Sequence, residues 1–133
     1  MTVDDKVVAE IEKGLVILLG IAPEDTVEVA RQMVEKITNL RIFEDADEKM
    51  NLSALDVDAE AIVVSQFTLY ADTSRGRRPS FIGAARPELA EPLVSAFAHL
   101  LTDQGVPTQT GVFGAMMEVA IVNDGPVTIV MEY

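Results

Sequence analysis

Apolar residues along the chain follow two spacings, which separate the expected strands from the expected helices. A nearly unbroken apolar run covers residues 15–21, and a second covers residues 61–70 with many β-branched and aromatic side chains. Short runs of this kind are typical of buried strands. Residues 25–40 and 88–103 carry apolar side chains three or four positions apart, which predicts two amphipathic helices.

The ends of the two helices are marked by residues with known preferences. Residues 23–25, Pro-Glu-Asp, favour a helix start, because acids are stabilising near a helix N-terminus. Gly105 and Pro107 stop the second helix. Pro92 is tolerable only in the first turn of that helix, where its missing N–H has no partner in any case.

Further strands are expected near both ends of the chain. The segments with strand-like composition are residues 7–11, 41–43, 112–113, 117–122 and 127–131. Residues 44–49 and 71–80 are polar or rich in Gly, Pro and Ser, so they are expected to be loops. Together with the two helices, this pattern predicts one α/β domain with mixed sheets over residues 1–133.

Composition narrows the class of protein. A chain of 133 residues with 49% hydrophobic residues suits a single globular domain. The net charge of −12 repels phosphate backbones at long range and disfavours a broad nucleic-acid groove. The absence of cysteine excludes disulfides, thiol nucleophiles and thiolate metal sites, and the single histidine, His99, excludes multi-histidine metal clusters.

The sequence contains no pattern that would place it in a membrane or a secretory pathway. Its longest apolar stretch, residues 14–23, is too short to span a bilayer. No basic segment precedes an apolar one at the N-terminus, so no signal peptide is expected. The expected location is therefore the cytoplasm.

Four arginines lie close together on this acidic chain. Arg75, Arg77, Arg78 and Arg86 fall in a stretch that contains no acid. One interpretation is a solvated loop that balances a nearby acidic surface. The other is a small phosphate-binding patch, because guanidinium groups match phosphate oxygens. On so acidic a chain, a concentrated patch favours contact with the end of a nucleic acid.

A second group of candidate residues ends the strand expected over residues 61–70. Ser65, Gln66, Phe67 and Thr68 offer hydroxyls, an amide and backbone N–H groups that can line a site. Composition alone favours a plain strand here, because Thr and Phe are common strand residues. Neither hydroxyl has an evident base, since His99 belongs to a helix and is expected to be a surface or core residue.

Two further segments have ordinary explanations. Residues 123–126, Asn-Asp-Gly-Pro, suit a hairpin turn. An X–Pro bond is cis in only about 5–6% of cases in folded proteins. A Gly-Pro turn exposes backbone carbonyls with almost no side chain around them, so it can present a rigid backbone surface to another molecule. The acidic residues 44–48 lack the glycine and the spaced glutamate of a calcium loop, so neither a metal nor a cofactor is expected.

Taken together, these segments resemble the D-aminoacyl-tRNA deacylase family, which removes wrongly attached D-amino acids from tRNA. The matching stretches are residues 41–45, 49–53, 65–70, 78–81, 110–115 and 122–128. They cover essentially the whole chain, and the combination of SQFT with a distal NDGPVT is specific. The resemblance implies a three-layer α/β fold with both long helices packed on one side. It also implies a homodimer with active sites at the subunit interface.

The resemblance assigns residues 65–68 to the pocket that holds the aminoacyl ester. Such an ester is already activated, so holding it and polarising its carbonyl with backbone N–H donors would supply most of the barrier reduction. In the family the neighbouring 2′-hydroxyl of the RNA assists, which agrees with the absence of a base here. Thr68 is accordingly expected to form the pocket and orient the carbonyl, and not to act as the nucleophile.

Chirality depends, by the same resemblance, on Gly125 and Pro126. They would form a Gly-cisPro element that one subunit inserts into the pocket of the other. A hydrophobic pocket separates near-isosteres by only about 1–3 kcal/mol, whereas fixed backbone carbonyls exclude an L side chain sterically. Glycine has no side chain to clash, so hydrolysis of glycyl-tRNA, including mischarged species, is also expected.

The remaining site residues concern the RNA end of the substrate. Phe113 and Met117 resemble the residues that cradle the terminal adenine, a role that suits an aromatic ring and a thioether. Arg77 and Arg78, with Phe81 beside them, would lie near the acceptor end of the tRNA.

The chain departs from the family's pattern at two places. The family usually opens with a strand containing Gln-Arg-Val ahead of the Val3 region, so that first strand is expected to be absent here. Met116 stands where an acidic residue is common. Two alternatives remain, a deacylase of altered chirality acting on L-alanyl-tRNA and a catalytically silent dimer that binds RNA ends. Phe67 favours the D-specific class over the first of these.

Overall fold

A computed structural model, which describes all residues 1–133, places a three-stranded parallel sheet at the centre of the fold. Its strands are β3 (Gly14–Leu19), β6 (Glu60–Ser65) and β7 (Thr108–Thr110), in the order β3-β6-β7. Because the strands are parallel, their carboxyl ends meet at one side of the sheet, which we call the carboxyl edge. The two apolar runs of the sequence form β3 and β6, as expected.

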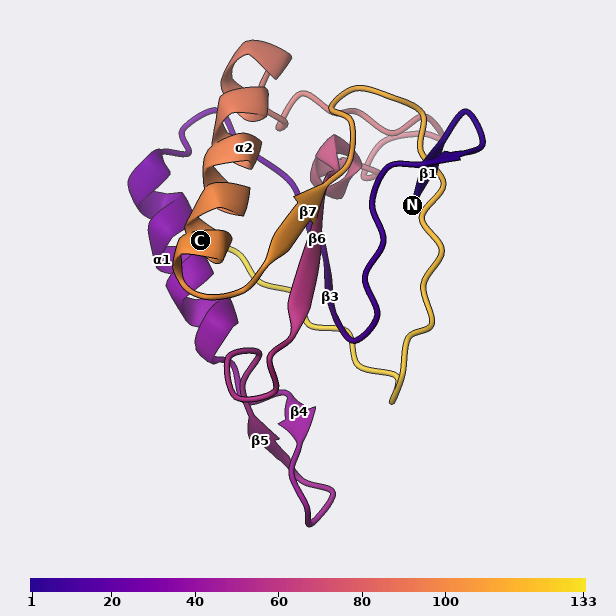
Figure 1. The fold of residues 1–133 in the computed structure, drawn as a ribbon. Coiled ribbons are helices and arrows are strands. Elements are labelled where there is room, and N and C mark those ends of the chain that lie inside the picture. The colour runs from indigo at the N-terminus through magenta and orange to yellow at the C-terminus, as the bar shows by residue number, and fades with distance from the viewer.

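Two helices pack together on one face of this sheet. They are α1 (Val27–Asn39) and α2 (Pro87–Asp103), and α2 also contacts β6 and β7 (Figure 1). The core between helices and sheet is apolar, with Phe97, Leu101 and Val63 almost fully buried. The sequence therefore predicted both helices, and their packing on one side of the sheet agrees with what the resemblance implied.

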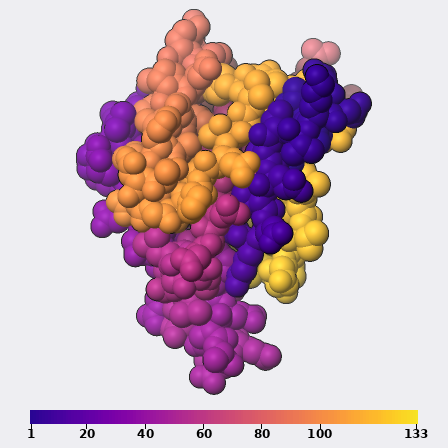
Figure 2. Space-filling view, viewed as in Figure 1, coloured from indigo at the N-terminus to yellow at the C-terminus, as the bar shows by residue number.

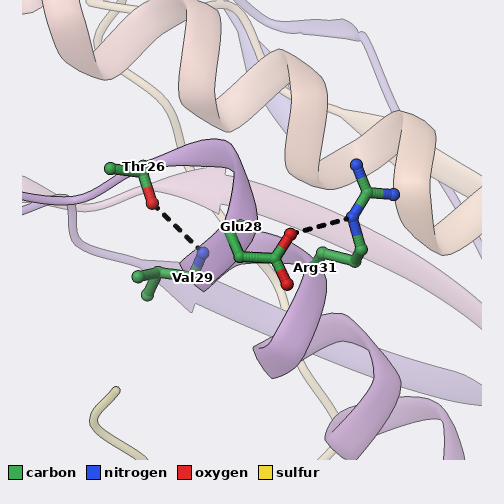
Figure 3. A network of polar contacts seen from close by, with 4 residues as sticks. All are labelled: Thr26, Glu28, Val29 and Arg31. Atoms are coloured by element: carbon green, nitrogen blue, oxygen red, sulfur yellow. Dashed lines mark hydrogen bonds and ion pairs between the residues drawn. The ribbon is translucent and has the colours of Figure 1, made fainter.

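The start of α1 is fixed by a side-chain cap. The Val29 N–H donates to Thr26 Oγ1 at 3.3 Å, and Arg31 pairs with Glu28 at 3.5 Å one turn further on (Figure 3). A capping threonine satisfies one of the N–H groups that have no partner inside the helix. The helix expected over residues 25–40 is thus confirmed, with its first turn two residues later.

Pro92 occupies a different position from the one that the sequence indicated. Because α2 begins at Pro87, Pro92 lies in the second turn and not in the first. A proline there removes the backbone hydrogen bond to the carbonyl of Glu88. Both Pro92 and Glu88 are exposed, so water can satisfy that carbonyl and the helix continues to Asp103.

The other face of the sheet is covered by segments near the two ends of the chain. A hairpin of β1 (Thr2–Val3) and β2 (Lys6–Val7) is bridged to Glu118 through Thr2. Figures 1 and 2 show the N-terminal segment beside the first part of the C-terminal segment, on the side away from the helices. A small cluster that includes Ile62 and Met117 packs beneath them. The C-terminus itself returns to the helices, where Tyr133 lies beside Gln32 and Lys36 of α1 (Figure 1). The structure thus has three layers, namely the helices, the sheet, and the N-terminal segment with the first part of the C-terminal segment.

Three expected strands, over residues 112–113, 117–122 and 127–131, are absent from the structure, and a fourth is shorter than expected. The strand expected over residues 61–70 ends at Ser65, and residues Phe67–Tyr70 form a 3-10 helix, η1. Residues 117–122 and 127–131 form no strand, and residues 119–133 make no backbone–backbone hydrogen bond. Their composition suits a strand, but a strand needs a neighbour, and only Glu118 has one.

The polar residues 44–49 mostly form a turn, as expected. The turn joins β4 (Phe43–Glu44) to β5 (Met50–Leu52). The sequence did not predict β5. Neither helix of the structure is long and apolar enough to cross a membrane.

Candidate functional site

The carboxyl edge of the sheet holds the segment that joins β6 to η1. The Gln66 N–H donates to the Leu19 carbonyl at 2.8 Å, which ties the first residue after β6 to the end of β3. Phe67 and Thr68 follow as the first residues of η1, and both are exposed. Their N–H groups donate to no carbonyl, because a helix leaves its first N–H groups unpaired. The edge therefore presents two backbone donors on a rigid base.

One side-chain hydrogen bond lies at this edge. The Gln66 Nε2 donates to Thr68 Oγ1 at 2.5 Å. The Phe67 ring, 55% exposed, meets the edge of the Phe81 ring with centroids 5.1 Å apart and an angle of 77°. The structure therefore brings Phe81 next to the residues 65–68 that the sequence singled out.

Phe113 and Met117 lie in the segment that follows β7. This segment starts at the same edge, where the Gly111 N–H donates to the Val63 carbonyl at 3.3 Å. Phe113 packs against the core on the helix side, whereas Met117 packs against the small cluster on the opposite face. Both side chains are half-buried, and the structure does not join them in one cluster.

The arginine-rich loop begins directly after η1. Its base is closed by two hydrogen bonds between the backbones of Asp72 and Ser80, at 2.7 and 2.9 Å. Between them, residues 73–79 are all exposed. The Asp72 carboxylate accepts hydrogen bonds from the Ser74 hydroxyl and N–H, and these lower the pKa of Asp72. The loop is therefore anchored at its base and open at its tip.

The arginines of this region have no acidic partner. The one ion pair in the structure joins Arg31 to Glu28 on α1. The unpaired arginines near the edge are Arg75, Arg77, Arg78 and Arg86. Unpaired cations beside a polar edge create a local field that attracts anions, even on a chain of net charge −12.

Apolar side chains around the edge were not identified from the sequence. Leu69 on η1 is 57% exposed, and Ile82 at the end of the arginine loop is 91% exposed. Leu69 was not identified because residues 61–70 were expected to form one continuous strand. For Ile82 the available signal was an apolar residue inside a polar, arginine-rich stretch.

The region holds no histidine that could act as a base, and hydrogen bonds from Ser74 occupy the Asp72 carboxylate. Burial, helped by nearby acids such as Asp25, raises the pKa of Tyr70, whose ring packs over Gly20. His99 is exposed on α2, and its Nδ1 lies 2.8 Å from the Ser95 carbonyl, which confirms the expectation of a surface residue. No three His, Cys, Asp or Glu side chains are placed to hold a metal ion.

Gly125 and Pro126 lie far from this edge within one chain. The bond between them is cis, and both residues are exposed. Asn123 holds the turn, because its Oδ1 accepts from the Val127 N–H at 3.2 Å and its Nδ2 donates to Thr128 at 3.1 Å. Figure 1 shows the sharp turn of the C-terminal segment at the opposite end of the sheet from η1. One chain therefore does not bring the turn to residues 65–68.

Sequence comparison gives matches along essentially the whole chain. A family model described as D-Tyr-tRNA(Tyr) deacylase matches residues 1–132. The chain is 59% identical over 132 residues to a D-aminoacyl-tRNA deacylase of Chloroflexus aurantiacus, covering 99% of this chain and 82% of the relative. It is 53% identical over 132 residues to a protein of the same name from Thermus aquaticus, covering 99% and 87%.

Two solved structures are also similar. A structure described as c-Myc DNA Unwinding Element Binding Protein aligns with a TM-score of 0.89 at 42% identity, covering 96% of this chain and 87% of the other. A probable eukaryotic D-amino acid tRNA deacylase aligns with a TM-score of 0.59 at 16% identity, covering 76% and 74%. The second similarity concerns the fold alone.

Proposed function

Because the chain belongs to the D-Tyr-tRNA(Tyr) deacylase family, we propose that it hydrolyses the ester that joins a D-amino acid to the terminal ribose of tRNA. The observation that carries this proposal is the carboxyl edge of the sheet, where Gln66 and Thr68 lie beside an anchored loop of unpaired arginines. Such an edge offers donors for an ester carbonyl and cations for the adjacent phosphates. The reaction belongs in the cytoplasm, where tRNA is charged.

The unpaired N–H groups of Phe67 and Thr68 are the donors that would polarise the ester carbonyl. Backbone donors held on the end of a strand need no reorganisation as negative charge develops on the carbonyl oxygen. An aminoacyl ester is already activated, so positioning the ester and polarising its carbonyl supply most of the reduction in the activation barrier. The edge contains no histidine that could act as a base. The ribose 2′-hydroxyl beside the ester assists the hydrolysis instead. Thr68 orients the carbonyl.

The Gly125–Pro126 turn would complete the site from the other subunit of a homodimer. Its place at the far end of its own chain supports this, because only a second copy can present it to the edge (Figure 1). The C-terminal segment also exposes Val122 at 95% and Val130 at 87%, and an apolar surface of this kind is typical of an interface. Inserted backbone carbonyls would exclude L side chains and leave glycine unrejected.

The RNA end of the substrate would lie along the arginine loop and the segment after β7. Arg77 and Arg78 have no acidic partner, which suits phosphate binding, and Phe81 adjoins the pocket through Phe67. Phe113 and Met117 belong to the segment that leaves the same edge, although they pack on opposite faces of the sheet, and we assign the terminal adenine to them.

The proposal is tested by following ester loss from D-tyrosyl-, L-tyrosyl-, glycyl- and L-alanyl-tRNA. Selective hydrolysis of the D-tyrosyl and glycyl esters is the expected result. Hydrolysis of L-alanyl-tRNA with the D ester untouched would establish the deacylase of altered chirality. Binding of charged tRNA without turnover would establish the silent binder. Either result would overturn the proposal.

A further inference from the structure

We propose that Ser74 keeps the Asp72 carboxylate from pairing with the arginines of the same loop, so that these arginines stay free to bind phosphate. The inference rests on the proposed function, because it concerns the loop to which the end of the tRNA is assigned there. It makes Ser74 and Asp72 positioning residues for binding, with no part in the chemical step.

The backbone of the loop places an acid within reach of an arginine. Asp72 and Ser80 form the bridge at the base of the loop, with hydrogen bonds of 2.7 and 2.9 Å between their backbones. Arg78 lies two residues before Ser80, which makes it the diagonal neighbour of Asp72 across this bridge. Diagonal neighbours of an antiparallel pair are within reach of long side chains. An ion pair between Asp72 and Arg78 is therefore the ordinary expectation for this loop.

The Asp72 carboxylate is occupied by Ser74 instead. Its Oδ1 accepts from the Ser74 N–H at 2.9 Å and from the Ser74 hydroxyl at 2.6 Å. The shorter distance is typical of a hydroxyl that donates to a charged carboxylate. The bond from the Ser74 hydroxyl is the largest cause of the lowered pKa of Asp72, so the carboxyl stays ionised at neutral pH. An ionised carboxylate only accepts, which fixes the direction of both bonds.

The arginines of the loop are free as a consequence. None of Arg75, Arg77 and Arg78 pairs with an acid, although Asp72 belongs to the same loop. An exposed ion pair contributes little free energy, so two hydrogen bonds from a neighbour in the chain are enough to compete with it. A guanidinium group that is not bound to a carboxylate keeps its charge and its donors for a phosphate. The bonds from Ser74 thus preserve the positive charge of the loop.

Ser74→Ala removes the hydroxyl bond and leaves Asp72 with only the N–H of residue 74. The carboxylate should then pair with a loop arginine, so the affinity for uncharged tRNA should fall about threefold, as expected for an exposed ion pair. The slope of log affinity against log salt should become smaller, because fewer phosphates are neutralised. The kcat on D-tyrosyl-tRNA should not change, since the effect is confined to binding. Filter binding at several salt concentrations and deacylation rates measure the two effects.

A second substitution separates charge from the shape of the loop. Asparagine at position 72 keeps an acceptor oxygen but has no charge to pair with an arginine. Ser74→Ala combined with Asp72→Asn should therefore bind tRNA at least as tightly as the unmodified protein. If Ser74 only shaped the loop, this second substitution would not restore binding.

Two single substitutions serve as matched controls. Ser74→Thr keeps the hydroxyl and should keep the affinity for tRNA. Thr73→Ala removes a neighbouring exposed hydroxyl that makes no bond to Asp72, so its affinity should not change either.

Two results would overturn the inference. One is a Ser74→Ala protein that binds tRNA as tightly, and with the same salt slope, as the unmodified protein. The other is a loss of affinity that persists after Asp72→Asn is added. Because the binding measurements use uncharged tRNA, they decide the inference separately from the proposed function. A protein that binds tRNA but hydrolyses no aminoacyl ester would refute the proposed function, and the binding of the Ser74 and Asp72 variants would still decide the inference.

Discussion

The carboxyl edge of the sheet and the C-terminal segment of residues 119–133 are both rich in strand-forming residues, yet they differ in how they are held. At the edge, hydrogen bonds link Gln66 to β3 and Asp72 to Ser80. In the C-terminal segment no backbone–backbone hydrogen bond forms, and apolar side chains such as Val122 and Val130 face outward. One region is complete within a single chain, whereas the other lacks a neighbour.

The difference divides the proposed site into two halves. The half that binds and polarises the ester is built on strand ends, so one chain positions it. The half that excludes L side chains is a turn at the far end of the molecule, so it acts only on a partner. Stability and selectivity should therefore respond to different substitutions.

Gly125→Ala should abolish most activity without unfolding the protein. Gly125 has φ +126, and an added Cβ would lie 2.9 Å from the Val127 side chain, so the turn has to change shape. A displacement of about 1 Å at a site can cost about 10²-fold in rate. The turn is exposed, so the thermal midpoint should move little. Deacylation rates and thermal unfolding measure the two effects.

The control for that substitution is Gly114→Ala, which also falls at a positive φ, of +77, but has no atom near its Cβ. It should share the backbone strain and retain much more of the activity. Equal loss of activity in both variants would contradict a special role for the Gly125 turn.

Arg77→Ala and Arg78→Ala should weaken tRNA binding by up to about tenfold each, with kcat less affected. Both side chains lie on the exposed loop and pair with no acid. If each neutralises one phosphate, the slope of log affinity against log salt should fall by about 1 for each arginine removed. Filter binding at several salt concentrations provides the measurement. Arg31→Ala on α1 is the control, and a slope change as large there would refute a specific patch.

Acid should destabilise the protein in part through Asp56. Hydrogen bonds from the Ser53 N–H and hydroxyl lower the pKa of Asp56. A carboxylate with a lowered pKa contributes stability above its unfolded pKa of about 3.9, and that stability disappears as the pH falls through the folded value. Thermal midpoints between pH 6 and pH 3 should therefore drop less steeply in Asp56→Asn. Parallel curves for the two proteins would rule this contribution out.

Asp5→Gly should stabilise the N-terminal hairpin slightly. Asp4 and Asp5 both have positive φ, of 49° and 62°, in the turn between β1 and β2, and glycine adopts this conformation without strain. The expected gain in unfolding free energy is about 0.5–1 kcal/mol in urea titration. Because Asp5 is exposed and belongs to none of the proposed site segments, activity should not change. A loss of stability would show that the Asp5 side chain matters more than its backbone.

Much of the fold could be predicted from local patterns in the sequence. The helices around Val34 and Phe97 follow from helical spacing, and β3 and β6 follow from continuous apolar runs. The 3-10 helix at Phe67–Tyr70 could not be predicted, because its residues have strand preferences and the chain turns there to reach the arginine loop. The strand-forming residues around Ile121 also led to a wrong prediction, because a strand forms only where a neighbouring strand pairs with it.

The candidate site was predictable in its members but not in its contacts. The motif at residues 65–68 and the arginine cluster stood out in the sequence, and the structure places both near one edge. The bond from Gln66 to Thr68 could not be foreseen, since it depends on the tight turn of η1. The separation of Phe113 from Met117 on opposite faces also required the fold.

Mixing two impaired variants tests the shared site most directly. Thr68→Val damages the edge and Gly125→Ala damages the turn, so a mixed dimer carries one site with both defects and one with neither. After subunit exchange at equal amounts, about a quarter of the unmodified activity on D-tyrosyl-tRNA should return, because the interface of a homodimer is symmetric. If the mixture is no more active than its components although mixed dimers form, the turn does not complete a partner's site.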